Sequence, residues 1–377
     1  MQSSFIKNSI VVVSLLVLLV FTATSQTHVT ITNGYGSGSY KGNSRLVHIW
    51  AQANPVNMVF DKWTGDTQLL LDPNSWHSRL ALKQKNISLT ATYKSAPAWS
   101  PTFETINGRL FGYYFPPNSR GLVFRFHGTG GGAVTFFNKV EDRAGANDFV
   151  VAGYAIVALD SDDRVNKQWS TALPPNNIDI TNVQAIINSF ISRGLILNGT
   201  PIFSHGMSNG GAFSPRVAYA LQFKAAAIYC APGSTFVNIT NVPTIWNMEQ
   251  NDDNENVGAA GNATAMVNSI TLMNRGIVSQ FNVNIPSPVY KQRFGRISGL
   301  TLSDSQTIYN SLKNNGFLDA ADYLSESPST SGWQNVLPAA YASYADGIAD
   351  ELSVCYSGHK FFSDYDSRVI DFFNARF

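Results

Sequence analysis

After Pro101 the sequence alternates between short apolar runs typical of buried strands and longer runs with helical spacing. Strands are predicted over 121–126, 154–159, 201–204, 225–229, 242–248 and 280–285. Helices are predicted over 138–153, 178–194, 210–222, 263–273 and 364–373. Strands that are separated by helices favour an α/β fold with a doubly wound, mainly parallel sheet. Because such sheets bind ligands at the carboxyl ends of their strands, residues that directly follow a strand are the most informative.

The sequence before Pro101 has a different periodicity. Polar and apolar residues alternate with period two over 28–32 and 87–93, and Asn-Gly and Gly-rich turn signals lie between these runs. The stretch 95–101 contains two prolines in seven residues and has the pattern of a linker. We therefore predict a small β-rich module over 26–95, a linker over 96–100 and a larger α/β domain over 101–377.

Residues 1–25 have the pattern of a secretory signal peptide. Lys7 is their only charge, the apolar run covers about 12 residues, and small residues precede Gln26. That run is shorter than the ~20 residues that a membrane-spanning helix needs. The sequence predicts export to an extracellular or periplasmic compartment, which is oxidising and poor in ATP and NAD.

The composition bounds the classes of partner and cofactor. Of the 377 residues 14% are charged and the formal net charge is +1, so we expect no nucleic-acid partner. We also expect a monomer. The six histidines and two cysteines show no metal-ligand spacing, and the chain is expected to need neither a metal nor another cofactor.

One motif carries most of the chemical information. Gly206-Met-Ser208-Asn-Gly210 follows a predicted strand, precedes a predicted helix and matches the pattern G-x-S-x-G. The two glycines are needed because a Cβ at either position would clash in so tight a turn. The strained backbone would hold the Ser208 hydroxyl away from the sheet, near a helix N-terminus. This pattern predicts a nucleophilic serine.

A glycine-rich loop, His127-Gly-Thr-Gly-Gly-Gly132, follows the first strand of the α/β domain. In a hydrolase it would supply the backbone N–H of Thr129 or Gly130 to a developing oxyanion. The backbone N–H of Asn209, next to the serine, would be the second donor.

The same loop has another interpretation. Gly128-x-Gly130-x-x-Ala133 also fits a dinucleotide-binding fingerprint, and the acidic Asp160 ends the next strand. A dinucleotide-dependent oxidoreductase is therefore an alternative, although it would leave Ser208 unexplained. In a hydrolase Asp160 would be structural and would cap or pair with the turn 161–164 that follows it.

A serine nucleophile needs a base, and the histidine count decides which one. His28, His48 and His77 lie in the β-rich module. His127 opens the glycine-rich loop and His205 directly precedes the serine motif, so neither can approach Ser208 from the opposite side. Only His359, in Ser357-Gly-His359 before the last predicted helix, is free to approach Ser208 from the opposite side.

The sequences Gly206-Met-Ser-Asn-Gly-Gly211 and Ser357-Gly-His359 resemble secreted serine esterases of the α/β-hydrolase superfamily, of the polyhydroxybutyrate depolymerase and feruloyl esterase type. The resemblance implies a triad in the chain order Ser, acid, His. It also implies an acid about nine positions after the proline that opens the relevant strand. Asp252 has that offset from Pro243. Asp253 is the alternative acid, and Glu249 and Glu255 are weaker candidates.

The segment from Thr30 to Tyr93 resembles the divergent B-repeat module of internalin-type secreted proteins. The similar features are "TNGYGSGSY", "WTGD", "DPNS" and "NISLTATY". The resemblance implies a compact β-rich, grasp-like fold and a spacer or adhesion role, with a cell-surface or polysaccharide ligand as the possible partner. Trp50, Trp63 and Trp76 could form a stacking platform, but at least Trp63 is expected in the core.

The interval between Asp252 and His359 is long and holds an insertion at about 288–350. We expect a helix over 303–324 within it, and a role as a lid or substrate wall. Trp333 from this insertion and Trp246 from the preceding strand are candidate substrate contacts. Cys230 and Cys355 are expected near one rim of the sheet, where a disulfide would anchor the loop of His359.

These observations predict a secreted serine hydrolase that cleaves carboxylic esters, either small or polymeric, through an acyl-enzyme. A serine peptidase of the same fold is the first alternative. A catalytically inactive binding or adhesion protein is the second.

Overall fold

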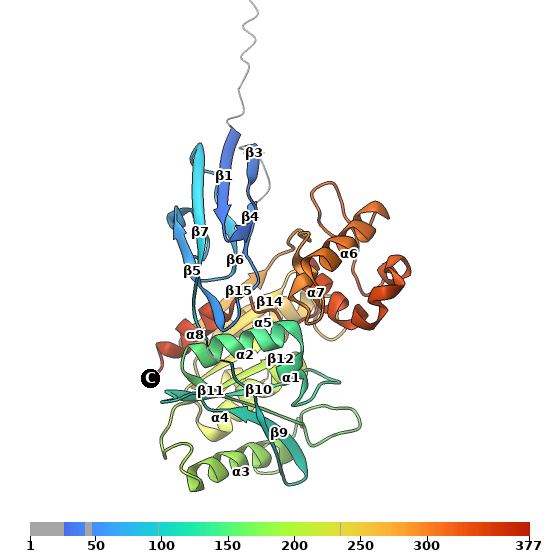
Figure 1. Ribbon diagram of the computed structural model, residues 1–377. Coiled ribbons are helices and arrows are strands. Elements are labelled where there is room, and N and C mark those ends of the chain that lie inside the picture. Colours follow the sequence, from blue (N-terminus) through green and yellow to red (C-terminus); the bar gives the residue numbers. More distant parts are fainter. Residues whose placement is uncertain (1–25, 42–46, 97, 234) are drawn as a thin grey trace, which may run out of the picture.

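The computed structural model describes residues 26–41, 47–96, 98–233 and 235–377. The predicted signal peptide, residues 1–25, lies outside the described residues. Figure 1 shows a β-rich module at one end, an α/β domain at the other, and an insertion that stands beside the module. None of the helices in the described ranges is both long enough and apolar enough to cross a membrane.

The β-rich module consists of two small sheets that enclose one hydrophobic core. The strand orders are β3-β1-β7-β5 and β2-β4-β6, with β1 and β7 parallel. Trp63 lies in the core and is 2% exposed, as expected. The elements are β1 (Gln26–Thr32), β2 (Gly34–Tyr35), β3 (Gly38–Lys41), β4 (Val47–Ala51), β5 (Met58–Gly65), η1 (Thr67–Leu69), β6 (His77–Leu80) and β7 (Asn86–Ser95).

The predicted α/β fold with a mainly parallel sheet is confirmed. Eight strands have the order β15-β14-β13-β12-β10-β11-β9-β8, and all neighbours from β15 to β11 pair in parallel. Together with the Ser208 turn after β12, this arrangement is that of an α/β-hydrolase. The strands are β8 (Thr102–Ile106), β9 (Arg109–Tyr114), β10 (Gly121–Phe126), β11 (Tyr154–Leu159), β12 (Ile202–Met207), β13 (Ala225–Tyr229), β14 (Thr244–Glu249) and β15 (Ser279–Asn284).

The hairpin of β8 and β9 was not predicted from the sequence. Its strands pair antiparallel and are joined by Asn107 and Gly108, both at positive φ. Asn-Gly between two short apolar-polar runs is a strong hairpin signal, so the sequence did contain the information. The hairpin extends the sheet beyond β11 at the edge remote from β15.

Helices cover both faces of the sheet, and residues from each face define the two layers. Core residues from α3 and α4 pack against Leu122 and Phe124, whereas core residues from α2 and α8 pack against Val123 and Phe203. The helix predicted over 138–153 is split at Lys139, whose backbone is extended. The helices are α1 (Thr135–Asn138), α2 (Val140–Val151), α3 (Ile178–Ser192), α4 (Asn209–Leu221), η2 (Thr235–Asn238), α5 (Gly258–Asn274) and α8 (Asp366–Asn374).

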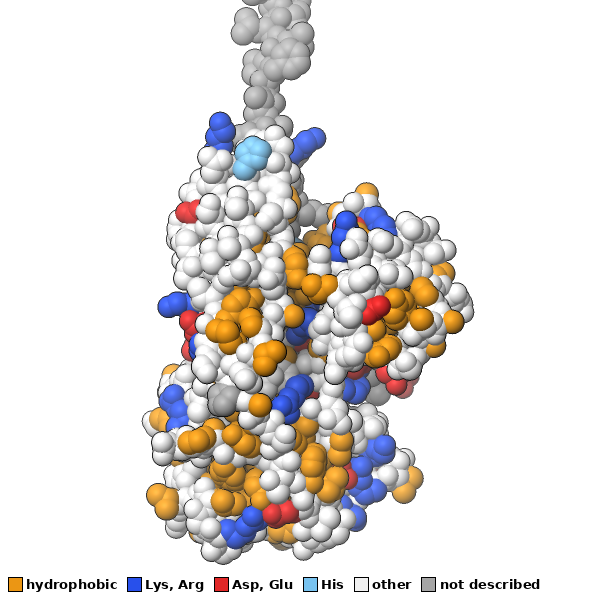
Figure 2. Space-filling model, viewed as in Figure 1, with side chains coloured by type: hydrophobic (Ala, Val, Ile, Leu, Met, Phe, Trp, Pro, Cys, Tyr) orange, Lys and Arg blue, Asp and Glu red, His pale blue; other side chains and the backbone are white. Residues whose placement is uncertain are grey.

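The insertion has a hydrophobic core of its own, which contains Ile308, Trp333 and Leu352. Its elements are η3 (Arg293–Arg296), α6 (Leu302–Asn314), η4 (Trp333–Val336), η5 (Ala339–Tyr344) and α7 (Ala345–Tyr356). The predicted helix over 303–324 is therefore too long. The observed helix, α6, begins with a capping box between Thr301 and Asp304 and ends before Gly316, whose φ is +83°. In Figure 2 the insertion and the module form two lobes side by side on the α/β domain.

Candidate active site

Ser208 lies in the turn between β12 and α4 with φ 55° and ψ −120°, a backbone conformation that is strained for a residue with a side chain. The glycines of the motif make this turn possible. A Cβ added at Gly206 would lie 2.1 Å from the carbonyl oxygen of Gly210, and one added at Gly210 would lie 2.2 Å from that of Phe126. The sequence motif therefore has the steric origin that was predicted for it.

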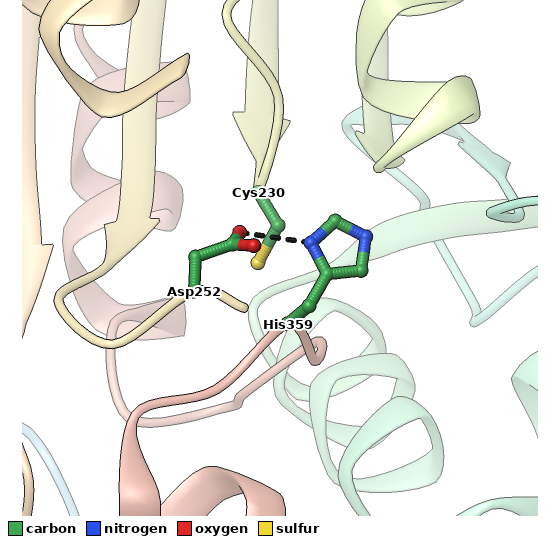
Figure 3. Close-up of side chains that lie close together, drawn as sticks. All are labelled: Cys230, Asp252 and His359. Carbon is green, nitrogen blue, oxygen red and sulfur yellow. Dashed lines mark hydrogen bonds and ion pairs between the residues drawn. The ribbon is translucent and has the colours of Figure 1, made fainter. Parts of the chain in front are cut away.

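His359 and Asp252 complete a chain of hydrogen bonds that begins at Ser208. His359 Nε2 lies 2.9 Å from Ser208 Oγ, and His359 Nδ1 lies 2.8 Å from Asp252 Oδ2. The side chain of Asp252 is buried and that of His359 is 14% exposed. Figure 3 shows the carboxylate facing Nδ1, with Asp252 from the loop after β14 and His359 from the loop after α7. The structure thus brings together the three residues that the sequence selected.

The alternative acid, Asp253, contacts the insertion with its side chain, and the backbone N–H of His359 also helps to lower its pKa. Its Oδ2 accepts hydrogen bonds from the hydroxyls of Ser327 (2.6 Å) and Ser329 (2.7 Å) in the insertion. Burial raises the pKa of Asp253, but these hydroxyls outweigh it and hold the pKa below its ordinary value. Glu249 accepts from Ser357 Oγ at 2.6 Å, two residues before His359. Neither acid contacts the imidazole of His359.

The glycine-rich loop offers one oxyanion donor rather than two interchangeable ones. The backbone N–H of Gly130 donates to the carbonyl of Lys167 at 3.3 Å. Those of Thr129 and Asn209 donate to none of the residues that the structure describes. Both residues line the same cavity as Ser208, and Asn209 begins α4, where the helix dipole also favours an anion. The backbone N–H groups of Thr129 and Asn209 are therefore the candidate oxyanion donors.

The glycine-rich loop is held from behind by buried polar contacts. His127 Nδ1 lies 2.8 Å from the carbonyl of Gly128, and burial lowers the pKa of His127 to about 4. Asp160 accepts from the backbone N–H of Ala133 at 2.8 Å and pairs with Arg164 at 3.2 Å. Asp160 is thus structural, as the hydrolase interpretation expects.

The dinucleotide interpretation fits this loop poorly. The fingerprint requires a helix that begins in the glycine loop and receives the pyrophosphate. Here α1 covers only Thr135–Asn138, and the extended backbone of Lys139 separates it from α2. The carboxylate of Asp160 contacts the loop itself and so is occupied.

A cavity of about 780 Å³ adjoins Ser208 and His359. Its wall includes Phe136, Met207 and Val257, beside the polar side chains of Lys139 and Asn254. No described residue between 288 and 350 lines it, so the expectation of a lid or substrate wall is not supported. The insertion reaches the rim of the site through Asp350, which pairs with Lys139 at 3.2 Å and with Lys360, and both lysines line the cavity.

The structure does not bring the two predicted substrate-binding tryptophans to this cavity. Trp246 and Trp333 are both completely buried. The indole of Trp246 packs beneath α5 and donates to the carbonyl of Pro232, and that of Trp333 fills the core of the insertion. A tryptophan that the sequence did not single out lies closer: Trp169 donates its backbone N–H to Asn209 Oδ1 at 2.7 Å. No periodic pattern surrounds Trp169, so no sequence signal pointed to it.

The predicted disulfide is wrong. Cys230 and Cys355 are both buried free thiols. Cys355 lies on α7 and packs into the core of the insertion, whereas Cys230 follows β13 and donates to the carbonyl of Lys360 at 3.1 Å. The two cysteines lie in different hydrophobic clusters because α7 belongs to the insertion and not to the loop of His359.

Cys230 nevertheless lies beside the proposed base. Ligand atoms of Cys230, Asp252 and His359 lie within 4.8 Å of one another, and these residue types can bind zinc. Figure 3 shows the thiol and the carboxylate beside the same edge of the imidazole. Burial raises the pKa of Cys230 well above its usual value, so the thiolate that a metal requires is disfavoured. Asp252 and His359 are also already bonded to each other.

Comparison with known proteins supplies no family name. No family model and no curated protein matches the chain. Solved structures that are similar in part include an esterase of Pyrococcus furiosus (12% identity, TM-score 0.37, covering 50% of this chain and 83% of that one). A ferulic acid esterase is similar at 10% identity and a TM-score of 0.38, over 49% of this chain and 88% of that one. An acetyl xylan esterase from Aspergillus awamori is similar at 13% identity and a TM-score of 0.38, over 47% of this chain and 81% of that one.

Proposed function

We propose that this protein is a secreted serine hydrolase that cleaves carboxylic esters through an acyl-enzyme. The observation that carries the proposal is the pair of contacts from His359, 2.9 Å to Ser208 Oγ and 2.8 Å to Asp252 Oδ2. These are the distances that general-base activation of a serine requires. The proposed oxyanion donors, Thr129 and Asn209, lie on the wall of the same cavity.

In the first half of the reaction His359 Nε2 accepts the proton of Ser208 as Oγ attacks the ester carbonyl. The negative charge on the carbonyl oxygen is held by the backbone N–H groups of Thr129 and Asn209. Asp252 accepts from Nδ1–H and stabilises the imidazolium that forms. The tetrahedral intermediate then collapses: the bond to the alcohol breaks, and the alcohol leaves with the proton from His359.

In the second half water replaces the alcohol. His359 removes a proton from the water, whose oxygen attacks the acyl carbon. Collapse of the second intermediate releases the carboxylic acid, and Ser208 regains its proton. Every proton and charge in this cycle is handled by residues of the chain.

The proposed location and partners rest on the sequence. The pattern of residues 1–25 supports export. The resemblance of residues 26–95 to an adhesion module supports a cell-surface or polysaccharide contact. Sedimentation of the full-length Ser208→Ala variant with insoluble polysaccharides measures that contact without turnover, and recovery of all the protein in the supernatant would contradict it.

Fluorophosphonate labelling tests the nucleophile. A labelled native protein, loss of label in Ser208→Ala and retention in Ser192→Ala are expected, because Ser192 is exposed at the end of α3 and remote from the motif. An unlabelled native protein would overturn the proposal in favour of an inactive binding protein, and labelling that persists in Ser208→Ala would show that Ser208 is not the nucleophile.

A substrate panel separates esterase from peptidase. We expect hydrolysis of p-nitrophenyl esters of short acyl chains and none of aminoacyl-anilides. Turnover of the anilides at a comparable kcat/KM would instead identify a peptidase with the same serine mechanism.

A further inference from the structure

The β-rich module contacts the polypeptide segment that directly follows His359. The contacts come from the loop Asp72–His77 of the module, hereafter the docking loop, and fall on residues 363–368. Ser75 Oγ donates to the carbonyl of Asp364 at 2.7 Å, and Trp76 Nε1 donates to Ser363 Oγ at 3.3 Å. Asp72 Oδ2 accepts from Ser367 at 3.1 Å and from Arg368 at 3.4 Å.

A buried chain of two imidazoles and a carboxylate lies at the centre of this contact. His77 Nδ1 lies 2.6 Å from Asp364 Oδ2, and His77 Nε2 lies 2.9 Å from His48 Nδ1. All three side chains are less than 10% exposed. Both histidines belong to the module and the carboxylate belongs to the α/β domain, so the chain crosses the boundary between them.

Ser363 is also held from the opposite side. Its backbone N–H and its hydroxyl both donate to Glu141 Oε2, at 2.8 and 2.6 Å. Glu141 in turn pairs with Arg293 and Arg296 of the insertion. The guanidinium of Arg296 lies 4.0 Å from the ring centroid of Trp76 in the docking loop. The module, the helix α2 and the insertion therefore fix Ser363 together.

The distance along the chain from this anchor to the proposed base is short. Ser363 is only four residues after His359, and the carbonyl of Lys360 between them accepts from Cys230. Only three residues separate Ser363 from His359, so we expect a displacement of Ser363 to reach the imidazole. Displacements of about 1 Å at a catalytic group can lower a rate about 100-fold.

We propose that the β-rich module is a positioning element for the proposed base, in which His77 holds Asp364 and thereby the loop of His359. This inference rests on the proposed hydrolase function and adds a second role to the spacer or adhesion role that the sequence resemblance implies. His77 touches neither the substrate nor the reacting atoms, so it is a positioning residue.

The buried charge of Asp364 gives the contact its strength. Asp364 Oδ1 has no hydrogen-bond partner among the described residues, and Oδ2 has His77. Removal of His77 would leave a buried carboxylate without its partner, which is more unfavourable than loss of an exposed ion pair. If the segment moves outward to regain hydration, the loop of His359 moves with it.

The experiment compares His77→Ala with His28→Ala in the full-length protein. His28 is a matched control because it is exposed on β1 and its ring contacts Ser39 within the module. We expect His77→Ala to lower kcat for a soluble p-nitrophenyl ester between about 10-fold and 100-fold while KM changes less than about 3-fold. His28→Ala should match the native protein in both constants.

Hydrogen exchange provides a readout that does not depend on turnover. Backbone amides of residues 357–364 should exchange faster in His77→Ala than in the native protein, and should be unchanged in His28→Ala. Asp364→Asn, which keeps an acceptor for His77, should retain most of kcat, whereas Asp364→Leu should lose it. Rescue by the conservative variant separates positioning from general destabilisation.

The outcomes distinguish this inference from the proposed function. If native turnover is present but His77→Ala keeps native kcat and native exchange at 357–364, the positioning role is wrong and the hydrolase stands. If exchange changes as expected but the native protein has no turnover, the hydrolase proposal fails, and the structural link from His77 to the loop of His359 stands. Should His77→Ala not fold, Trp76→Phe and Ser75→Ala each remove one docking bond, and native kcat in both would equally overturn the inference.

Discussion

Asp252 and Asp253 are adjacent in the chain, but only the carboxylate of Asp252 bonds to the imidazole of His359, whereas that of Asp253 bonds to the insertion and lies near the backbone N–H of His359. Asp252 accepts from the imidazole of His359 at 2.8 Å, and Asp253 accepts from Ser327 and Ser329 in the insertion at 2.6 and 2.7 Å. One residue thus orients the proposed base and the next fixes the insertion to the same loop.

The two acids should therefore differ sharply in kinetic effect. Asp252→Asn is expected to lower kcat by about 10³- to 10⁴-fold, because the amide favours the wrong tautomer of His359 and does not stabilise its cation. Asp253→Asn should lower kcat less than about tenfold. Steady-state kinetics on a p-nitrophenyl ester measure both, and the reverse order of effects would show that Asp253 is the acid of the triad.

The glycines of the Ser208 turn should tolerate no side chain. In Gly210→Ala the new Cβ would lie 2.2 Å from a backbone oxygen, which no rotamer change can relieve. We expect a loss of at least about 3 kcal/mol in the free energy of unfolding, or no folded protein.

Gly199→Ala is the control for this prediction. Gly199 has a positive φ of +90° but nothing within 4 Å of an added Cβ. Its cost should be only the ~1–2 kcal/mol of the left-handed backbone. Denaturant titration measures both variants, and equal losses in the two would refute the steric argument for Gly210.

A cavity of about 580 Å³ between the module, α2 and the insertion contains a carboxylate whose titration should affect stability. Burial raises the pKa of Asp148 to about 7, against the opposing charges of Lys94 and Arg296. In the unfolded chain this carboxyl loses its proton near pH 4, so stability should fall as the pH rises from about 4 to about 7.

The variant Asp148→Asn removes that titration. It should be about 1–2 kcal/mol more stable than the native protein at pH 8, and the difference should shrink toward pH 4. Asp163→Asn is the control, since hydrogen bonds from Asn166 lower the pKa of Asp163 and its removal should bring no gain at pH 8. Thermal unfolding of both variants and the native protein between pH 4 and pH 8 measures these differences in stability. A difference for Asp148→Asn that does not change with pH would contradict the raised pKa of Asp148.

The two cysteines should behave as buried thiols. A reducing agent should leave the midpoint of thermal unfolding unchanged, because Cys230 and Cys355 are not bonded. A thiol reagent should react with about two groups per chain only after unfolding. If no group reacts after unfolding in the absence of a reducing agent, the two cysteines are bonded to each other and the assignment as free thiols is wrong.

Much of the proposed catalytic site was predictable because its signals are local. The turn around Ser208 depends on close contacts of Gly206 and Gly210, and any sequence that forms this turn must place small residues there. His359 followed from counting, since the chain has few histidines. Asp252 required a resemblance, because nothing local to the sequence separates it from Asp253.

The features that the sequence did not determine all depend on long-range packing. Trp246 and Trp333 are buried in separate cores, and Gly130 is occupied by Lys167, which lies 37 positions further along the chain. The bond between His77 and Asp364 spans 287 positions. Local sterics and composition fix which turns, strands and helices form, and so the sequence alone determined the α/β fold and the serine motif. Only the tertiary structure decided which buried polar groups meet, because a desolvated donor or carboxylate takes whatever partner the packing of distant elements brings to it.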